Sequence, residues 1–407
     1  MKFHHQGGAS TPAPQDRDQF TEEMSQPPST LRTRIHDIDA LRGFALLGIL
    51  IANITYAASG FPIHLADDPT YSSGLDHAVR WLGHALVDLK FYLLFSFLFG
   101  YSFQLQIEAA QRAGAQFKPR MLRRLGGLFV IGALHAIFLI TGDILTVYAL
   151  IGLVLLAMRG VRDKTALVTA AAIYGYLFVT LGAAVLFVDS TALVDPAGAL
   201  AAAQQTTTNL AGSFGDVIGE HVRALPTFGL AQLTVQGPTT LAVMLLGMVA
   251  GRRRLLANLT GTEPVLRKIQ LIGFPIGLLG SIVYAAGGNG DTLSVMVGVM
   301  TAPLLSAAYA ATLLRLMHSS DLGGLLAPAG RMALSNYLGQ SLATVAIFTG
   351  VGFGLVGQVS PLETFTFAVA IFTAQLAISH WWMSRYTYGP VEGILRAVTN
   401  ATPPTWR

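Results

Sequence analysis

Long apolar segments separated by short polar joints recur along most of the chain. A helix that crosses a bilayer needs about 20 mostly apolar residues, and the pattern predicts about ten such spans. The spans cover residues 41–58, 87–105, 125–141, 144–158, 165–188, 238–250, 269–286, 293–316, 332–356 and 362–379. The pattern therefore predicts an all-α fold, a polytopic transmembrane helical bundle that forms a single domain over residues 35–400.

Three stretches depart from this pattern. Residues 1–34 are rich in Pro, Gln, Ser, Thr and charge, a composition typical of disorder, and we expect a disordered cytoplasmic tail. Residues 189–236 are less hydrophobic than the spans, and we interpret them as a non-cytoplasmic excursion that contains an interfacial helix. Residues 401–407 form a short C-terminal tail.

The distribution of Lys and Arg predicts the orientation of the bundle. Cytoplasmic loops of membrane proteins carry an excess of these residues. The basic clusters at 112–124, 159–164, 252–254 and 267–268 all fall on one side of the predicted spans, together with Arg32 and Arg34. The opposite loops, which include Asp67 and Asp68, are poor in Lys and Arg. With about ten spans, both termini are expected in the cytoplasm.

Composition supports a membrane location and excludes several classes of chemistry. The chain is 52% hydrophobic and 12% charged, whereas soluble domains carry about 25% charged residues. It has no cysteine, which excludes disulfides, thiolate nucleophiles and Cys-ligated metals. The net charge of +4 fits the bias of cytoplasmic loops and gives no case for nucleic-acid binding. No firm metal-ligand spacing occurs among the histidines, so no metal site is expected.

The strongest candidate for catalysis is a histidine in the third span. Ionisable side chains inside a membrane are costly and mark functional sites by default. His135 lies before the tight turn that contains Asp143, and Tyr148 follows on the returning helix. Asp143 is placed to orient the imidazole of His135 as a general base, with Tyr148 at a similar depth. A histidine buried for packing is the alternative interpretation.

Other polar residues within or beside the spans are candidates for binding a substrate or cofactor. Each also has a structural interpretation, as a helix cap, a snorkelling cation or a hydrogen bond between helices. These candidates are Asp39, Arg42, Lys90, Tyr148, Arg331, Asn336, Tyr337 and Gln340. His77 and His84, which precede the second span, are alternative catalytic histidines.

Four blocks of sequence together resemble the YeiB-like family of bacterial inner-membrane proteins, which carry a domain of unknown function, number 418. The blocks are DALRG at 39–43, KFYLLFSFLFG at 90–100, LH at 134–135 with GDIL at 142–145, and GRMALSNY at 330–337 followed by YGP at 388–390. The resemblance covers nearly the whole chain after the tail. It implies a multi-pass protein of the bacterial cytoplasmic membrane.

That family resembles the transmembrane acyltransferases, which include the acyltransferase-three proteins and heparan glucosaminide N-acetyltransferase. The resemblance implies transfer of an acyl group from cytoplasmic acyl-CoA or acetyl-CoA to a sugar or another small acceptor at the far side. Arg42 and cytoplasmic arginines such as Arg123 and Arg124 would then contact the CoA phosphates. In those relatives the catalytic histidine lies at the far-side start of the second span, where His77 or His84 fits better than His135.

Two other functions remain open from the sequence. A transporter or flippase for a small or lipid-linked solute would use His135 and Asp143 as a proton relay. A non-catalytic membrane partner protein would use the polar residues only to hold helices together. A homodimer is one expected assembly, and no permanently bound cofactor is expected.

Overall fold

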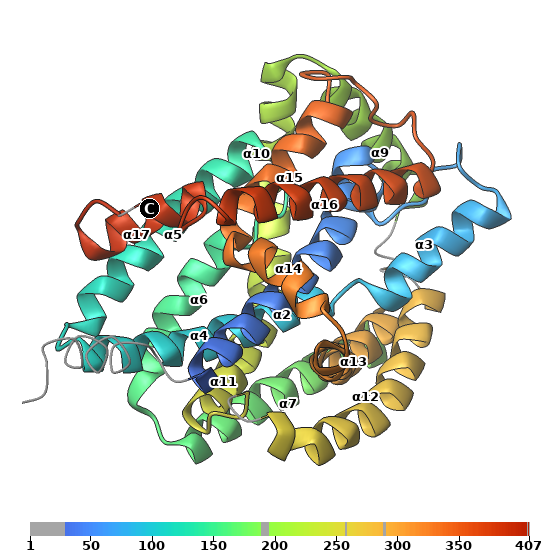
Figure 1. Cartoon of the computed structure of the whole chain (residues 1–407). Coiled ribbons are helices and arrows are strands. Elements are labelled where there is room, and N and C mark those ends of the chain that lie inside the picture. The colour runs from blue at the N-terminus through green and yellow to red at the C-terminus, as the bar shows by residue number, and fades with distance from the viewer. Residues whose placement is uncertain (1–28, 189–194, 257–258, 288–289, 405, 407) are drawn as a thin grey trace, which may run out of the picture.

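A computed structural model describes residues 29–188, 195–256, 259–287, 290–404 and 406 (Figure 1). Residues 1–28 of the predicted tail lie outside these described residues, whereas residues 29–34 are helical and open the first element, α2 (Ser29–Ala58). Every described element is helical, in agreement with the predicted all-α bundle.

The centre of the bundle is formed by α2 and its neighbours. α2 packs against α4 (Phe91–Arg112) and against a C-terminal group made of α14 (Leu322–Arg331), α15 (Ala333–Phe348) and α16 (Pro361–Met383). α4 in turn packs along α11 (Gly237–Arg252). The first described helix therefore meets helices from the C-terminal part of the chain in the core, where Leu46 and Leu50 of α2 are 1% exposed.

Among the described residues, eight helical segments are long and apolar enough to cross a membrane. They are His36–Ala58, Gly74–Arg112, Phe117–Phe138, Asp163–Phe187, Phe214–Arg252, Glu263–Gly287, Thr292–Ser319 and Pro361–Met383. Each of them overlaps one of the predicted spans, and six contain theirs entirely; the spans predicted at 125–141 and 165–188 run past the ends of their helices. The chain is thus a multi-pass membrane protein, and the sides that its loops face remain predictions.

The other two predicted spans coincide with shorter helices. α6 (Leu145–Ala157) has 13 residues, followed by the 3-10 turn Met158–Gly160, and α15 has 16 residues. At 1.5 Å per residue they reach roughly 20 and 24 Å, less than the roughly 30 Å of a hydrocarbon core. The prediction of helix up to residue 356 is wrong beyond Phe348, because the chain turns there and Gly354 and Gly357 adopt positive φ.

Residues 195–236, which we interpret as the excursion, are mostly helical. α9 (Pro196–Ala211) and α10 (Phe214–Ala231) lie at one end of the molecule (Figure 1). The π-helical turn Gln232–Gln236 joins α10 to α11 without a break. The sixth span therefore starts before its predicted first residue, 238, in one helical segment, Phe214–Arg252.

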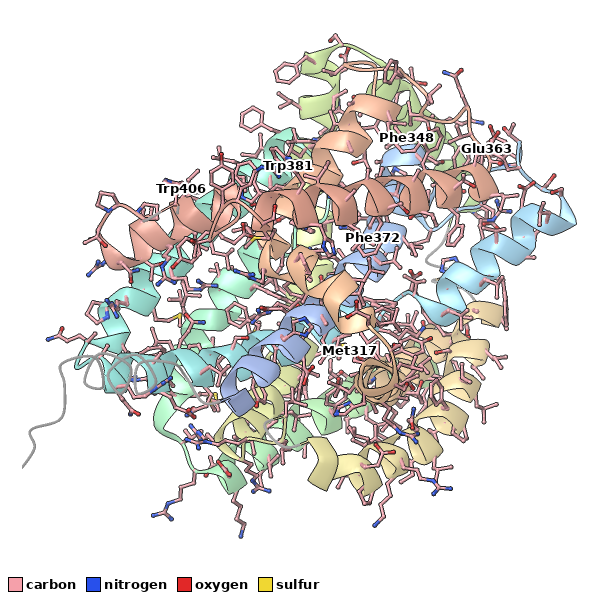
Figure 2. The ribbon with its side chains drawn as sticks, viewed as in Figure 1. Met317, Phe348, Glu363, Phe372, Trp381 and Trp406 are labelled. Atoms are coloured by element: carbon pink, nitrogen blue, oxygen red, sulfur yellow. The ribbon has the colours of Figure 1, made fainter. Side chains whose placement is uncertain are left out.

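The remaining helices surround this centre. They are α3 (Gly74–Leu86), α5 (Phe117–Phe138), α7 (Asp163–Phe187), α12 (Leu259–Gly287), α13 (Thr292–Ser319), α17 (Pro390–Asn400) and the 3-10 turn Pro62–His64. α12 and α13 pack together at one edge, and α17 packs on α5 at another (Figure 1). Glu363 lies near one end of α16 and Trp381 near the other (Figure 2), where the Trp381 side chain is 52% exposed.

Candidate functional site

The α5–α6 hairpin buries a histidine and a carboxylate against each other. His135 near the end of α5 and Asp143 in the turn have side chains 0% and 1% exposed, and His135 Nδ1 lies 2.9 Å from Asp143 Oδ1. Gly142 permits this tight turn, because its φ of +89° is one that residues with a Cβ rarely adopt. The sequence prediction that this hairpin pairs His135 with Asp143 agrees with the geometry.

Hydrogen bonds hold both the side chain and the backbone oxygen of Asp143. Its Oδ2 accepts the backbone N–H of Thr146 at 2.7 Å, so the carboxylate caps the N-terminus of α6, where the helix dipole stabilises negative charge. Its backbone oxygen accepts a hydrogen bond from Gln232 Nε2 at 2.9 Å. The π-helical turn between α10 and α11 thus supplies a support for the hairpin.

The second ring nitrogen of His135 contacts a serine from a distant part of the chain. His135 Nε2 lies 2.8 Å from the Oγ of Ser341 in α15. A carboxylate can only accept hydrogen bonds, so Asp143 favours a proton on Nδ1. In the neutral ring that proton leaves Nε2 as the acceptor for the hydroxyl of Ser341. Asp143 and His135 lie at ion-pair distance, and His135 and Ser341 lie at hydrogen-bond distance, so the three side chains stand in series.

Close packing encloses this series. The ring of Tyr337, one turn before Ser341, lies 4.8 Å from the ring of His135, centroid to centroid. On the other side, a Cβ added to Gly132 of α5 would lie 2.7 Å from Asp143 Oδ2. The absence of a side chain at Gly132 therefore allows α5 to approach the N-terminus of α6. Of the predicted binding residues, Tyr337 is one that packs against His135 and so lies in the same site as His135 and Asp143.

Tyr148 is placed elsewhere. Its hydroxyl donates to the backbone oxygen of Tyr92 at 2.7 Å and lies 2.8 Å from Ser96 Oγ, both in α4. These contacts give Tyr148 a role in joining α6 to α4, and its depth relative to His135 stays a prediction. Whether this position also binds a substrate stays a prediction.

Asn336 and Gln340 belong to a neighbouring hydrogen-bond network. Gln340 Nε2 donates to Gln375 Oε1 at 2.9 Å, and Gln375 Nε2 donates to the backbone oxygen of Asn336 at 2.8 Å. Asn336 Nδ2 donates to Ser379 Oγ at 2.9 Å. This geometry joins α15 to α16, as expected for amides between membrane helices.

Asp39 and Arg42 form a third group near the start of α2. Arg42 Nη1 lies 2.5 Å from Asp39 Oδ1, and its Nη2 donates to Ser102 of α4. Gly330 packs directly on the backbone oxygen of Asp39. The guanidinium of Arg331 is close enough to Asp39 for a charge interaction, but Arg331 is exposed and donates to the backbone of Thr387.

Lys90, His84 and His77 lie away from the His135 pair. Lys90 is 1% exposed, donates to the backbone oxygen of His84 at 3.0 Å and lies over the ring of Tyr284 at 5.5 Å. His84 Nδ1 contacts Asp88 Oδ2 at 2.7 Å and is one-third exposed. The Nδ1 of His77 lies 3.2 Å from a guanidinium nitrogen of Arg80. The chain thus contains a second His–Asp pair, more open than the first.

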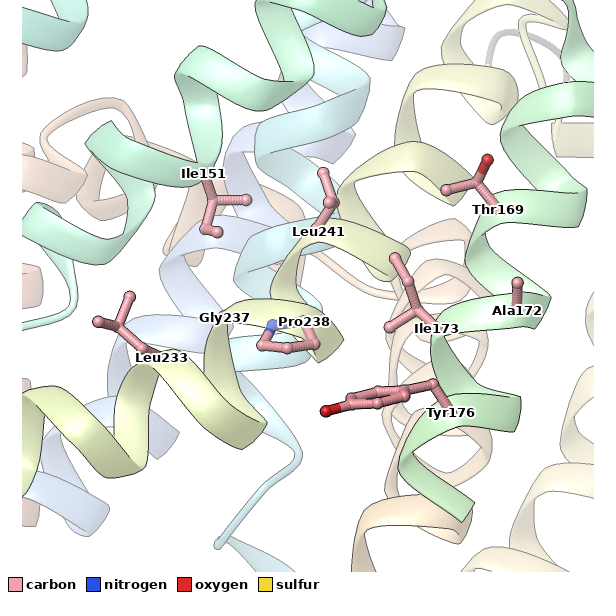
Figure 3. Close-up of a pocket in the computed structure, with 9 residues that line it drawn as sticks. All are labelled: Ile151, Thr169, Ala172, Ile173, Tyr176, Leu233, Gly237, Pro238 and Leu241. Atoms are coloured by element: carbon pink, nitrogen blue, oxygen red, sulfur yellow. The ribbon is translucent and has the colours of Figure 1, made fainter. Parts of the chain in front are cut away.

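An open groove lies on the surface of the bundle between α6, α7 and the start of α11 (Figure 3). Its volume is about 450 Å³, and its lining is Ile151, Thr169, Ala172, Ile173, Tyr176, Leu233, Gly237, Pro238 and Leu241. None of these residues belongs to the His135 site. Within the part of the chain that the structure describes, no group of three His, Asp or Glu residues is placed to hold a metal ion.

Comparison with known proteins places this chain in a family. Residues 250–402 match the model of a protein family described as "Protein of unknown function (DUF418)". An uncharacterized 39.9 kDa protein from Bacillus acidopullulyticus is 30% identical over 375 residues, covering 91% of this chain and 95% of that protein. The chain belongs to the DUF418 family.

Two further relatives align over nearly the full chain. The uncharacterized protein YxaH of Bacillus subtilis strain 168 is 28% identical over 91% of this chain and 96% of its own length. The uncharacterized protein YeiB of Escherichia coli K12 is 27% identical over 89% and 95%. The DUF418 match includes Ser341, whereas the full-length relatives also span His135 and Asp143.

Sequence reasoning missed Ser341 as a member of the site. Ser341 follows Tyr337 by four residues, so both occupy one face of α15. Serine in a membrane helix usually bonds to its own backbone, however, and this spacing alone gave no reason to join it to a histidine 206 positions earlier.

Proposed function

We propose that this DUF418 protein is a transmembrane acyltransferase of the bacterial cytoplasmic membrane. It would move an acyl group from cytoplasmic acyl-CoA or acetyl-CoA to a sugar or another small hydroxyl or amine at the opposite face. The observation that carries the proposal is the contact of His135 with Asp143 at Nδ1 and with a hydroxyl at Nε2. A base held in this way by a carboxylate is the arrangement that acyl transfer to oxygen or nitrogen requires.

His135 is the proposed base. Its Nε2 would take the proton of the attacking hydroxyl or amine, and the Asp143 carboxylate would stabilise the imidazolium that forms. Burial strengthens that electrostatic interaction, because the local dielectric is low. The resemblance of this family to the transmembrane acyltransferases supports the same reaction class.

Substrates must reach a site that is closed in this structure. The side chains of His135 and Asp143 are 0% and 1% exposed. Access therefore requires α15 to move relative to the α5–α6 hairpin. The hydrogen bond from Ser341 to His135 lies at this boundary and would be exchanged for a bond to the substrate.

Release of CoA from acetyl-CoA tests this proposal. The full-length protein is reconstituted in proteoliposomes with acetyl-CoA and a panel of sugars that includes glucosamine. Because the chain has no cysteine, the thiol of free CoA can be measured with Ellman's reagent without background from the protein. We expect acceptor-dependent CoA release that falls about 10²- to 10⁴-fold in His135→Ala, the range for loss of a general base.

The alternative histidines provide the comparison variants. His77→Ala and His84→Ala are expected to retain most of the activity, since neither side chain contacts the His135 pair in the structure. Activity that survives His135→Ala but is lost in His84→Ala would move the active site to the second His–Asp pair. Absence of CoA release by the wild-type protein across the panel would contradict acyl transfer.

A proton-coupled transporter is the second candidate. The complete enclosure of His135 and Asp143 favours it, because a proton relay needs only water access on alternate sides. Solute counterflow in proteoliposomes without acetyl-CoA, lost in Asp143→Asn, would support this function over acyl transfer.

A further inference from the structure

The hydroxyl of Ser341 is diverted from the usual partner of a helical serine. Serine and threonine in membrane helices commonly donate to the backbone oxygen four residues earlier. Ser96 does so at 2.7 Å, and Thr301 and Thr312 each do so at 2.8 Å. The corresponding distance from Ser341 Oγ to the oxygen of Tyr337 is 3.4 Å, while its distance to His135 Nε2 is 2.8 Å.

The position of Ser341 matches the requirements of an activated nucleophile. A nucleophilic serine needs a base within hydrogen-bond reach and a third group that orients the base. His135 supplies the base at 2.8 Å, and Asp143 supplies the orienting group at 2.9 Å from the other ring nitrogen. Three separate elements, α15, α5 and the turn before α6, converge to place these groups.

We propose that Ser341 is a catalytic nucleophile that carries the acyl group as a covalent ester between two half-reactions. This inference rests on the proposed acyltransferase function and adds a residue and an intermediate to it. General acid–base catalysis by His135 alone, with direct transfer between the substrates, needs no such ester.

The first half-reaction consumes the donor. Ser341 Oγ attacks the thioester carbonyl carbon, and its proton passes to His135 Nε2. The carbon–sulfur bond then breaks, and His135 returns the proton to the leaving sulfur. The products are free CoA thiol and acyl-Ser341.

The second half-reaction regenerates the serine. The hydroxyl or amine of the acceptor attacks the carbonyl carbon of the ester and gives its proton to His135 Nε2. The bond from that carbon to Ser341 Oγ breaks, and Oγ takes the proton back. Both half-reactions balance without an oxidant or reductant.

A covalent carrier suits the closed geometry of this site. Donor and acceptor enter from opposite sides of the membrane in the proposed function, and the site is buried between them. With acyl-Ser341 as the carrier, the two substrates need not occupy the bundle at the same time. The kinetic expectation is therefore a ping-pong pattern.

The experiment is to trap the ester in the absence of an acceptor. Full-length protein in proteoliposomes is incubated with acetyl-CoA labelled with ¹⁴C in the acetyl group, quenched in acid and separated from free label. We expect label on the wild-type protein that hydroxylamine releases and that peptide mass spectrometry assigns to Ser341. Ser341→Ala should carry no label, while Ser306→Ala, which changes a buried serine of α13, should label like the wild type.

A second variant keeps the test valid if Ser341→Ala folds poorly. Ser341→Cys introduces the sole thiol of the chain. We expect it to become labelled as a thioester, which hydroxylamine releases faster and at lower pH than the serine ester. A shift in hydroxylamine sensitivity is an effect that a purely structural role of Ser341 would not produce.

The outcomes separate this inference from the proposed function. Acceptor-dependent CoA release by the wild type without protein-bound label, together with activity in Ser341→Ala, would overturn the covalent role and leave acyl transfer intact. Label at another residue would also overturn it. Failure of the wild type to release CoA with any acceptor would count against the acyltransferase itself.

Discussion

Replacement of Gly132 by alanine tests whether α5 must approach the N-terminus of α6 as closely as the structure indicates. The added Cβ would lie 2.6 Å from the backbone nitrogen of Thr146, 2.7 Å from Asp143 Oδ2 and 2.9 Å from Leu145 Cβ. Distances below 3.0 Å are not tolerated, so either the hairpin opens or the Asp143 carboxylate leaves its cap. The substitution therefore alters the geometry of the site without removing any of its polar groups.

The expected loss of stability follows from two contributions. Overpacking of a close-packed position costs about 1–3 kcal/mol, and loss of the hydrogen bond from Thr146 N–H to a charged carboxylate costs about 1.5–3 kcal/mol. The two overlap, because one movement can relieve both, and we expect a decrease of about 2–5 kcal/mol in the free energy of unfolding. Proposed CoA release should fall with it, since His135 loses its orienting contact.

A matched glycine on the same helix provides the control. A Cβ added to Gly126 meets no atom within 4 Å, so Gly126→Ala should leave stability unchanged or slightly higher. Both variants are compared with the wild type by equilibrium unfolding in detergent, followed by circular dichroism. If the free energy of unfolding of Gly132→Ala lies within about 0.5 kcal/mol of that of Gly126→Ala, the close contact between α5 and the α6 N-terminus is refuted.

Two further predictions concern helix caps. Hydrogen bonds from Ser294 hold the pKa of the Asp291 carboxyl below its ordinary value of 3.8 in the folded protein. The ionised carboxylate therefore contributes its full stabilisation above pH 3.8, and this stabilisation is lost as the pH falls through the lowered pKa of the folded state. The stability difference between wild type and Asp291→Asn in thermal unfolding should therefore shrink below pH 3.8, and a difference that grows there would contradict the cap. Glu392 accepts the backbone N–H groups of Leu334 and Ser335 at 2.7 and 3.0 Å, so Glu392→Gln should destabilise the protein by about 1–2 kcal/mol, because a charged acceptor at the start of α15 is lost; an unchanged unfolding midpoint would refute this.

The sequence was sufficient for the fold class and for the His135–Asp143 contact. Both depend on local information, namely runs of apolar residues and a tight turn that returns α6 beside α5. The length of α15 was overestimated for a physical reason. Val356, in the stretch beyond the helix, is apolar and 3% exposed because it is buried within the protein, and hydropathy does not distinguish burial in protein from burial in lipid.

The parts of the site that the sequence did not predict depend on how helices rotate and pack. Tyr148 points to α4 because of the rotation of α6 about its axis, which no local pattern reveals. The partnership of Ser341 with His135 requires two elements from distant parts of the chain to meet. Such contacts follow from tertiary packing, and no spacing between residues in a single sequence predicts them.

The separation between His135 and Ser341 has a consequence for biosynthesis. The two residues are 206 positions apart, and translation at about 5–20 residues per second would place roughly 10–40 s between their appearances. Throughout this interval the nascent chain holds a histidine and a carboxylate in the membrane without the helix that covers them. A chain truncated before α15 would leave this polar pair uncovered in an incomplete bundle, a signal by which membrane quality control could distinguish unfinished copies from complete ones.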